Sequence, residues 1–156
     1  DPEAEIVLHG ISMGGATVMM TSGEENLPSQ VKAVVEDCGY TSVWDIFADE
    51  LNALYNLPAF PALDMSNLVA KIRAGYDLKK ASALEQVKKS QVPILFIHGS
   101  QDNFVHTDMV YELYDAAQCE KDLLIVEGAG HGQAYTLDPD LYFQRVFEFL
   151  EDKILK

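Results

Sequence analysis

Cysteine is scarce in this sequence, and the two residues present, Cys38 and Cys119, are too few for a disulfide framework. Neither has the spacing of a metal site, so we expect free thiols and neither a metal nor an organic cofactor. Basic residues are scarce as well, with 11 Lys and Arg against 25 Asp and Glu and a formal net charge of −14. Such a surface repels phosphate backbones and anionic lipid, so no nucleic-acid partner is expected.

Long apolar runs are also missing, and no stretch approaches the roughly 20 residues that a membrane-spanning helix needs. The sequence opens with DPEAEIVLHG, in which neither a methionine nor a signal peptide precedes the first apolar run. We therefore expect the sequence to begin in the middle of a larger protein. Its compartment stays open between the cytoplasm and a membrane-anchored extracytoplasmic location. The 156 residues are 48% hydrophobic and 23% charged, which is ordinary for a globular core.

Four short apolar runs predict strands, at residues 5–10, 31–38, 92–99 and 122–128. The runs are continuously apolar, as expected of parallel strands that are covered on both faces. Helical patterns follow them, at 14–21 with Gly23 as a stop, after Thr107 as a cap, and after Asp138 as a cap with Pro139 in the first turn. This alternation predicts an α/β fold with a parallel sheet and right-handed crossovers.

One connection, at about 41–90, is too long for a simple crossover and looks helical. Ser42 with Asp45, and Ser82 with Glu85, have the spacing of capping boxes. Prolines in LPAFPALD (57–64) break the segment, and an apolar face precedes them, made of Trp44, Phe47, Leu51 and Leu54. We expect a helical insert here, which is either a cap over an active site or a plain structural elaboration.

The first strand runs into Gly10-Ile11-Ser12-Met13-Gly14, a G-x-S-x-G pattern between a strand and a helix. A sharp turn there would expose the Ser12 hydroxyl, and the flanking Gly10 and Gly14 would permit a strained backbone and close packing. The helix that begins behind Ser12 favours developing negative charge. The pattern therefore predicts a nucleophile elbow, although a glycine-rich turn with an incidental serine also matches so short a motif.

A working serine needs a base and an acid at the same edge of the sheet, in the chain order Ser, acid, His. The third strand leads to Asp102 and the fourth to His131. The other histidines fit less well. His9 lies within a strand and His106 in a loop. His98 precedes the acid in a turn, and a role in shaping that turn is the simpler interpretation of it. Asp37, at the end of the second strand, is the alternative acid.

The chemistry then assigns roles. Ser12 attacks a carbonyl carbon, His131 accepts its proton and returns it to the leaving group, and Asp102 orients and stabilises the imidazole. The backbone N–H of Met13 supplies one oxyanion donor, and a second is expected from a loop after an earlier strand.

The segments HGISMGG, VVEDCGYTSVWD, PILFIHGSQDNFV and GAGHG resemble the C-terminal half of α/β-hydrolases, in particular bacterial serine aminopeptidase-like and esterase-like cell-surface hydrolases. The resemblance covers nearly the whole chain. It implies an α/β-hydrolase core made of the last four strands, and it places Ser12, Asp102 and His131 on the nucleophile, acid and base, with Met13 as oxyanion donor. His106 and Ala83 stand where relatives frequently have proline.

The predicted function is hydrolysis of a carboxylic ester through an acyl-enzyme, with a small ester or short peptide as substrate. A peptidase or aminopeptidase of the same fold shares these residues, and a non-catalytic binding module is the alternative from another class. In the resembled fold, further strands lie beyond the strand at 5–10. Alone, this strand would be an apolar edge, through which we expect the chain to self-associate.

Overall fold

A four-stranded parallel sheet forms the centre of the computed structural model, which describes residues 3–154. Its strands are β1 (Ile6–Ile11), β2 (Val31–Asp37), β3 (Ile94–Gly99) and β4 (Lys121–Val126), in that spatial order. The four predicted runs are these four strands, and the predicted α/β fold is confirmed. Because all strands are parallel, the loops that leave their carboxyl ends share one edge of the sheet.

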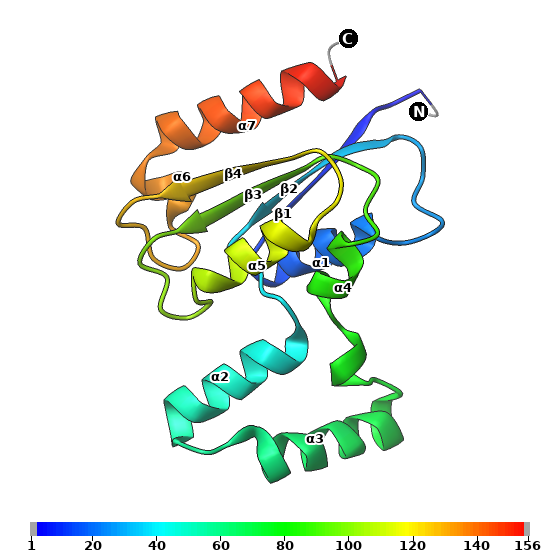
Figure 1. The fold of residues 1–156 in the computed structure, drawn as a ribbon, viewed down its shortest axis with the longest axis vertical. Coiled ribbons are helices and arrows are strands. Elements are labelled where there is room, and N and C mark those ends of the chain that lie inside the picture. Colours follow the sequence, from blue (N-terminus) through cyan, green and yellow to red (C-terminus); the bar gives the residue numbers. More distant parts are fainter. Residues whose placement is uncertain (1–2, 155–156) are drawn as a thin grey trace.

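Helices cover both faces of the sheet (Figure 1). One face packs against α7 (Pro139–Ile154), with Tyr142, Val146 and Phe149 in the core. The other packs against α1 (Met13–Ser22), α4 (Ala83–Val87) and α5 (Asp108–Ala116). β3 is buried along its whole length, which explains the apolar run Ile94–Ile97 with which it begins. The short α6 (Ala134–Leu137) leads into α7.

Most predicted helix ends are correct. Asp138 accepts a hydrogen bond from the Leu141 N–H at 3.1 Å, and Gly23 ends α1. Thr107 precedes α5, but its side chain does not cap the helix. Its hydroxyl donates instead to the Gly99 carbonyl at 2.8 Å, so it ties α5 to the end of β3.

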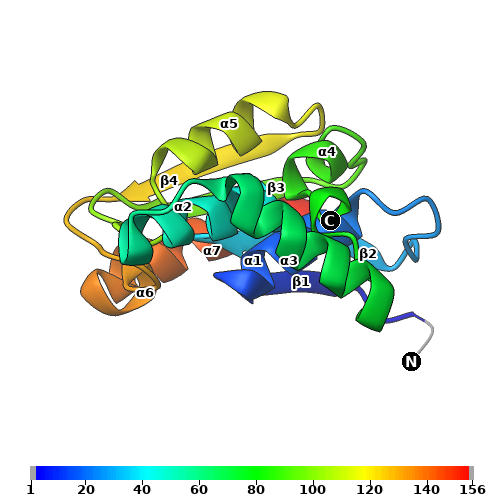
Figure 2. The same cartoon turned by 90° about the horizontal axis from the view of Figure 1, so that it is seen from below.

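The insert stands apart from the core as α2 (Val43–Tyr55), α3 (Ala59–Ala74) and the 3₁₀ helix η1 (Leu78–Lys80), and Figures 1 and 2 show α2 and α3 side by side. Ser42 caps α2 and Ser82 caps α4, each accepting the predicted backbone N–H, from Asp45 and Glu85. The expected range of 41–90 also includes α4, which packs on α1 as part of the core. The separate unit therefore ends before Ser82.

Polar contacts hold the insert together, and an apolar cavity lies between its helices. The Lys79 ammonium lies 4.1 Å from the centre of the Trp44 ring and 2.9 Å from Asp64 Oδ1. A cavity of about 330 Å³ lies between the helices, lined by Phe47, Glu50, Leu51, Leu54, Tyr55, Ala62, Leu63, Ser66 and Leu78. Three of the four predicted face residues line it, but Phe47 and Leu54 remain largely exposed.

Within residues 3–154, no helix has the length and apolarity to cross a bilayer. β1 pairs only with β2, so it is the edge strand of the described sheet, and its Ile6 and Ile11 are about two-fifths exposed (41% and 39%). That self-association occurs through this edge stays a prediction.

Candidate active site

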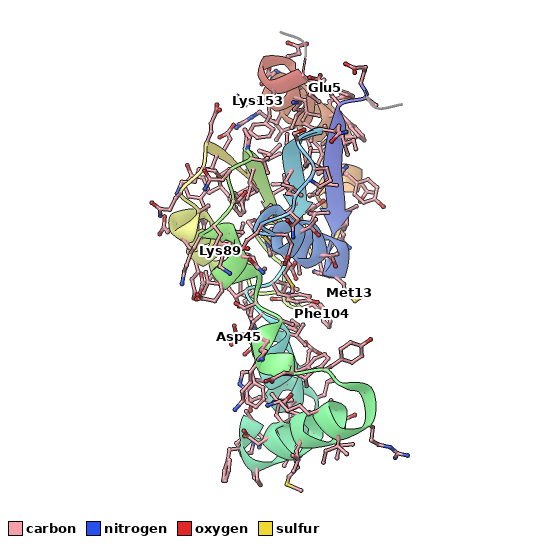
Figure 3. The ribbon with its side chains drawn as sticks, turned by 90° about the vertical axis from the view of Figure 1, so that its right-hand side faces the viewer. Glu5, Met13, Asp45, Lys89, Phe104 and Lys153 are labelled. Carbon is pink, nitrogen blue, oxygen red and sulfur yellow. The ribbon has the colours of Figure 1, made fainter. Side chains whose placement is uncertain are left out.

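Ser12 sits at a sharp turn between β1 and α1. Its backbone has φ 57° and ψ −118°, a conformation that side-chain-bearing residues rarely adopt. The turn is held by the Ser12 N–H, which donates to the Asp37 carbonyl at 2.8 Å, and by the Ser12 carbonyl, which accepts from Ala16. Met13 next to it lies on the side of the core that faces the insert (Figure 3). The strained turn therefore presents the Ser12 side chain at the edge where the loops converge.

Glycine is required on one side of this turn. A Cβ on Gly10 would lie 2.1 Å from the Gly14 carbonyl oxygen, so no side chain fits there. A Cβ on Gly14 would have no atom of the described residues within 4 Å, so the predicted close approach does not occur at that position. It falls instead on Gly15, where a Cβ would lie 3.0 Å from the Asp37 carbonyl oxygen.

The structure brings Ser12, His131 and Asp102 into one hydrogen-bonded chain. Ser12 Oγ lies 2.8 Å from His131 Nε2, and His131 Nδ1 lies 2.8 Å from Asp102 Oδ2. The Asp102 carboxylate can only accept a hydrogen bond, so the neighbouring His131 Nδ1 carries the imidazole proton in the neutral ring and donates it to Oδ2. Nε2 is then free to accept the Ser12 proton, which is the arrangement that nucleophilic attack requires.

Asp102 is buried, and its carboxylate is surrounded by donors. Oδ1 accepts from the Phe104 and Val105 N–H groups, each at 2.9 Å. Burial alone raises the pKa of Asp102, but the hydrogen bonds from His98, His131 and these two N–H groups outweigh it and hold the pKa at about 2. Asp102 is therefore ionised at neutral pH and able to stabilise an imidazolium.

His131 is partly accessible, with 26% of its side chain exposed. The Phe104 ring packs against its imidazole with centroids 4.9 Å apart. Phe104 lies on the side of the core nearest the insert (Figure 3). As the first residue of α1, Met13 has an N–H without an intrahelical acceptor, and it follows Ser12 directly. That N–H is available as an oxyanion donor.

The remaining candidate histidines lie elsewhere. His9 Nε2 bonds the Tyr142 hydroxyl at 2.9 Å, on the α7 face of the sheet, and His106 is exposed. Asp37 supports the elbow through its backbone carbonyl, not its side chain. Its carboxylate is buried with no well-formed hydrogen bond to the described residues, and burial raises its pKa.

Among the described residues, one group has metal-ligand character: Cys38, Asp102 and His131 offer one ligand atom each, all within 4.8 Å of one another. Asp102 is already bonded to His131, and His131 is bonded to Ser12, so the hydrogen-bonded chain accounts for the arrangement of these two side chains. Cys38 is a buried free thiol, and burial raises its pKa, which keeps it protonated and unreactive.

Two neighbours of the Ser12–His131–Asp102 hydrogen bonds are not predicted from the sequence. They are Phe104, which packs on His131, and His98, for which the sequence predicts only a role in the turn. His98 does bond within the turn, with Nε2 2.9 Å from the Val105 carbonyl, but it also lies 3.3 Å from Asp102 Oδ2. The spacing H-G-x-x-D after a buried strand was the available signal.

Glu36, in the middle of the sheet, is fully buried beside this site. Its Oε2 accepts the Gly39 N–H at 3.0 Å, while Oε1 has no partner among the described residues. Burial raises the pKa of Glu36 to about 8, against the opposing effect of His98. A carboxyl whose pKa is higher in the folded state than in the unfolded one favours folding at low pH, and this contribution is lost as pH rises through about 4.5 to 8.

Replacing Glu36 with glutamine is expected to remove that pH dependence, because Gln is neutral and still accepts the Gly39 N–H. The free energy of unfolding of E36Q relative to the unmodified protein should therefore rise between pH 5 and 8, by on the order of 1–4 kcal/mol. Urea denaturation at three pH values measures it, with E112Q, on the exposed face of α5, as the control. A difference that is constant with pH would show that Glu36 is ionised throughout.

The chain is similar to known proteins in sequence and in fold. The model of the prolyl oligopeptidase family matches residues 2–156. The uncharacterized protein YqkD of Bacillus subtilis is 31% identical over 147 residues, which cover 94% of this chain and 48% of YqkD. The chain thus spans about half the length of this curated relative.

Solved structures share the fold. An acylaminoacyl peptidase of Pyrococcus horikoshii superposes with a TM-score of 0.70 and 22% identity, over 99% of this chain and 25% of that one. An esterase domain from Rhodothermus marinus superposes with a TM-score of 0.64 and 20% identity, over 94% of this chain and 60% of that one. An esterase of Pyrococcus furiosus superposes with a TM-score of 0.68 and 19% identity, over 96% of this chain and 54% of that one. The predicted α/β-hydrolase fold is confirmed.

Proposed function

The chain belongs to the prolyl oligopeptidase family, of serine hydrolase type, and from that premise we propose that it carries the catalytic residues of an enzyme that cleaves carboxylic esters through an acyl-enzyme. The observation that carries the proposal is the continuous chain Ser12–His131–Asp102, with both contacts to His131 at 2.8 Å. A binding module of this fold has no use for all three groups in that geometry.

In the proposed reaction, His131 Nε2 removes the Ser12 proton as Oγ attacks the carbonyl carbon. Asp102 balances the imidazolium charge, and the Met13 N–H donates to the oxyanion. His131 then gives its proton to the leaving alcohol, and water releases the acyl group by the same steps in reverse. A second oxyanion donor is proposed from a segment outside this sequence, in line with the greater length of YqkD.

Peptide cleavage is the second candidate, because the family model and the Pyrococcus horikoshii structure are those of peptidases. The same three residues serve both reactions, and an amide leaving group only places a heavier demand on proton donation by His131. The choice of ester therefore rests on the resemblance to esterases and needs a direct assay.

Two measurements on the full-length protein test the proposal. A fluorophosphonate probe should attach covalently to Ser12, as located by peptide mass spectrometry. A p-nitrophenyl butyrate assay run beside an N-acetyl-alanine p-nitroanilide assay separates the substrates, and kcat/KM should be at least about tenfold higher for the ester, a difference of ~1.4 kcal/mol. Labelling with a preference for the anilide would favour the peptidase, and an unlabelled Ser12 would contradict both.

A further inference from the structure

His98, near the end of β3, is a fully buried imidazole that the reaction above does not use. Its Nε2 faces two oxygen atoms, the Val105 carbonyl at 2.9 Å and Asp102 Oδ2 at 3.3 Å. Both atoms are acceptors only, because Asp102 is ionised. Nε2 must therefore carry a proton and donate to both.

This donation completes the set of hydrogen bonds to Asp102. Oδ1 accepts two backbone N–H groups, and Oδ2 accepts His131 Nδ1 and His98 Nε2. A carboxylate offers about four acceptor positions, so all of them are occupied. The two imidazoles share one oxygen atom, which means that the His98 donor limits both the rotation of the carboxylate and the charge that faces His131.

A second buried group, Glu36, lies near His98 and interacts with it electrostatically. His98 Nδ1 and Glu36 Oε1 are both buried without a partner among the described residues. Glu36 pairs with Phe96 in the sheet register, and His98 is two residues further along β3, so both side chains lie on the same face of neighbouring strands. The charged or titratable groups around His98 are Glu36 and Asp37 on β2, and Asp102 and His131 in the loops.

The electrostatics agree with a proton held at this place. Burial lowers the pKa of His98, but the hydrogen bonds to Asp102 and Val105 and the charge of Glu36 together raise it above its ordinary value. Glu36 in turn retains a proton more readily than a surface carboxyl does. A raised pKa favours the protonated ring, and in both the charged and the neutral form of His98 the two acceptors at Nε2 require a proton on that nitrogen.

We propose that His98 is a positioning residue, which donates from Nε2 to the Asp102 carboxylate, opposite His131, and is supported from β2 by Glu36. The proposal rests on the proposed catalytic role of Asp102. It goes beyond a role in shaping the turn, for which the bond to Val105 alone would be enough.

Two substitutions in the full-length protein separate these roles. His98→Gln keeps an N–H donor near the position of Nε2, whereas His98→Leu fills a similar volume without a donor. Loss of one hydrogen bond to a charged group should lower kcat of the Leu variant about 10–100-fold, with KM changed less than about threefold. The acid limb of its kcat/KM profile should move to higher pH, because Asp102 without this donor attracts the imidazolium proton more strongly. The Gln variant should retain most activity and the original profile.

A measurement without turnover keeps the test independent of the proposed function. In the unmodified protein, ¹⁵N NMR of the histidines should show His98 with a proton on Nε2, and the far-downfield proton of the His131–Asp102 bond should shift in His98→Leu but not in His98→Gln. A His98 found as the Nδ1–H tautomer, or a folded Leu variant with unchanged kcat and profile, would overturn the proposal. A Gln variant as impaired as the Leu variant would do the same. If Ser12 proved unreactive while the proton resonance behaved as expected, the proposed function would fail and the placement of His98 would stand.

Discussion

Replacing Ser12 with alanine in the full-length protein is expected to lower the turnover of a short p-nitrophenyl ester by about 10⁴-fold or more. The hydroxyl is the only atom in the hydrogen-bonded chain positioned to attack, since His131 Nε2 bonds it directly at 2.8 Å. Alanine removes the nucleophile without adding atoms to the strained turn. Binding of substrate should change little, so the loss should appear in kcat.

The matched control is Ser29→Ala, on an exposed loop before β2. It should leave the rate and the thermal midpoint unchanged. Fluorophosphonate labelling should disappear in Ser12→Ala and persist in the control. The residual activity after loss of a nucleophile is far below about a hundredth of the original. If Ser12→Ala kept more than that, another group would be the nucleophile.

The second large effect concerns the acid. Asp102→Asn should lower kcat by about 10⁴-fold, as expected when a triad histidine is held in the wrong tautomer. The two backbone N–H groups at Oδ1 will select the amide oxygen for that position. The amide NH₂ then faces His131 Nδ1, which must accept and move its proton to Nε2. With a proton on Nε2, the imidazole no longer accepts from Ser12.

Asp37→Asn is the matched comparison at the alternative acid. Asp37 holds Ser12 through its backbone carbonyl at 2.8 Å, and an amide side chain preserves that bond. Its buried carboxyl also favours the neutral form, which asparagine imitates. We expect Asp37→Asn to remain within about tenfold of the unmodified kcat, roughly 1.4 kcal/mol. A larger loss at Asp37 than at Asp102 would transfer the role of the acid to Asp37.

The sheet could be predicted from the sequence because its cause is local. An unbroken apolar run such as Ile94–Ile97 has few alternatives to a strand buried on both faces. The same argument predicts that the loops carrying the candidate catalytic residues meet, because parallel strands bring their carboxyl ends to one edge of the sheet. Ser12, Asp102 and His131 follow from this argument, and in the structure His131 bonds both Ser12 and Asp102.

What could not be predicted depends on distances between segments far apart in the chain. Nothing in the local pattern distinguishes Gly14 from Gly15, and only the approach of β2 shows which one lacks room for a side chain. The contact between His98 and Asp102 needs the loop conformation that carries Asp102 back toward β3. Thr107 had the right position for a cap, but a carbonyl of β3 was the better partner for its hydroxyl.

The way in which the insert is attached has a mechanical consequence. Its two connections to the core meet at one antiparallel bridge, between Ser42 and Ser82, and α2 and α3 pack on each other and on η1. The insert is also joined to the core by packing, because Ile46 of α2 is buried in a cluster with Val105. The Val105 N–H donates to Asp102 Oδ1, so a displacement of the insert as one body would disturb the loop that holds the acid. The position of the insert and the hydrogen bonds of Asp102 are therefore mechanically coupled through Ile46 and Val105.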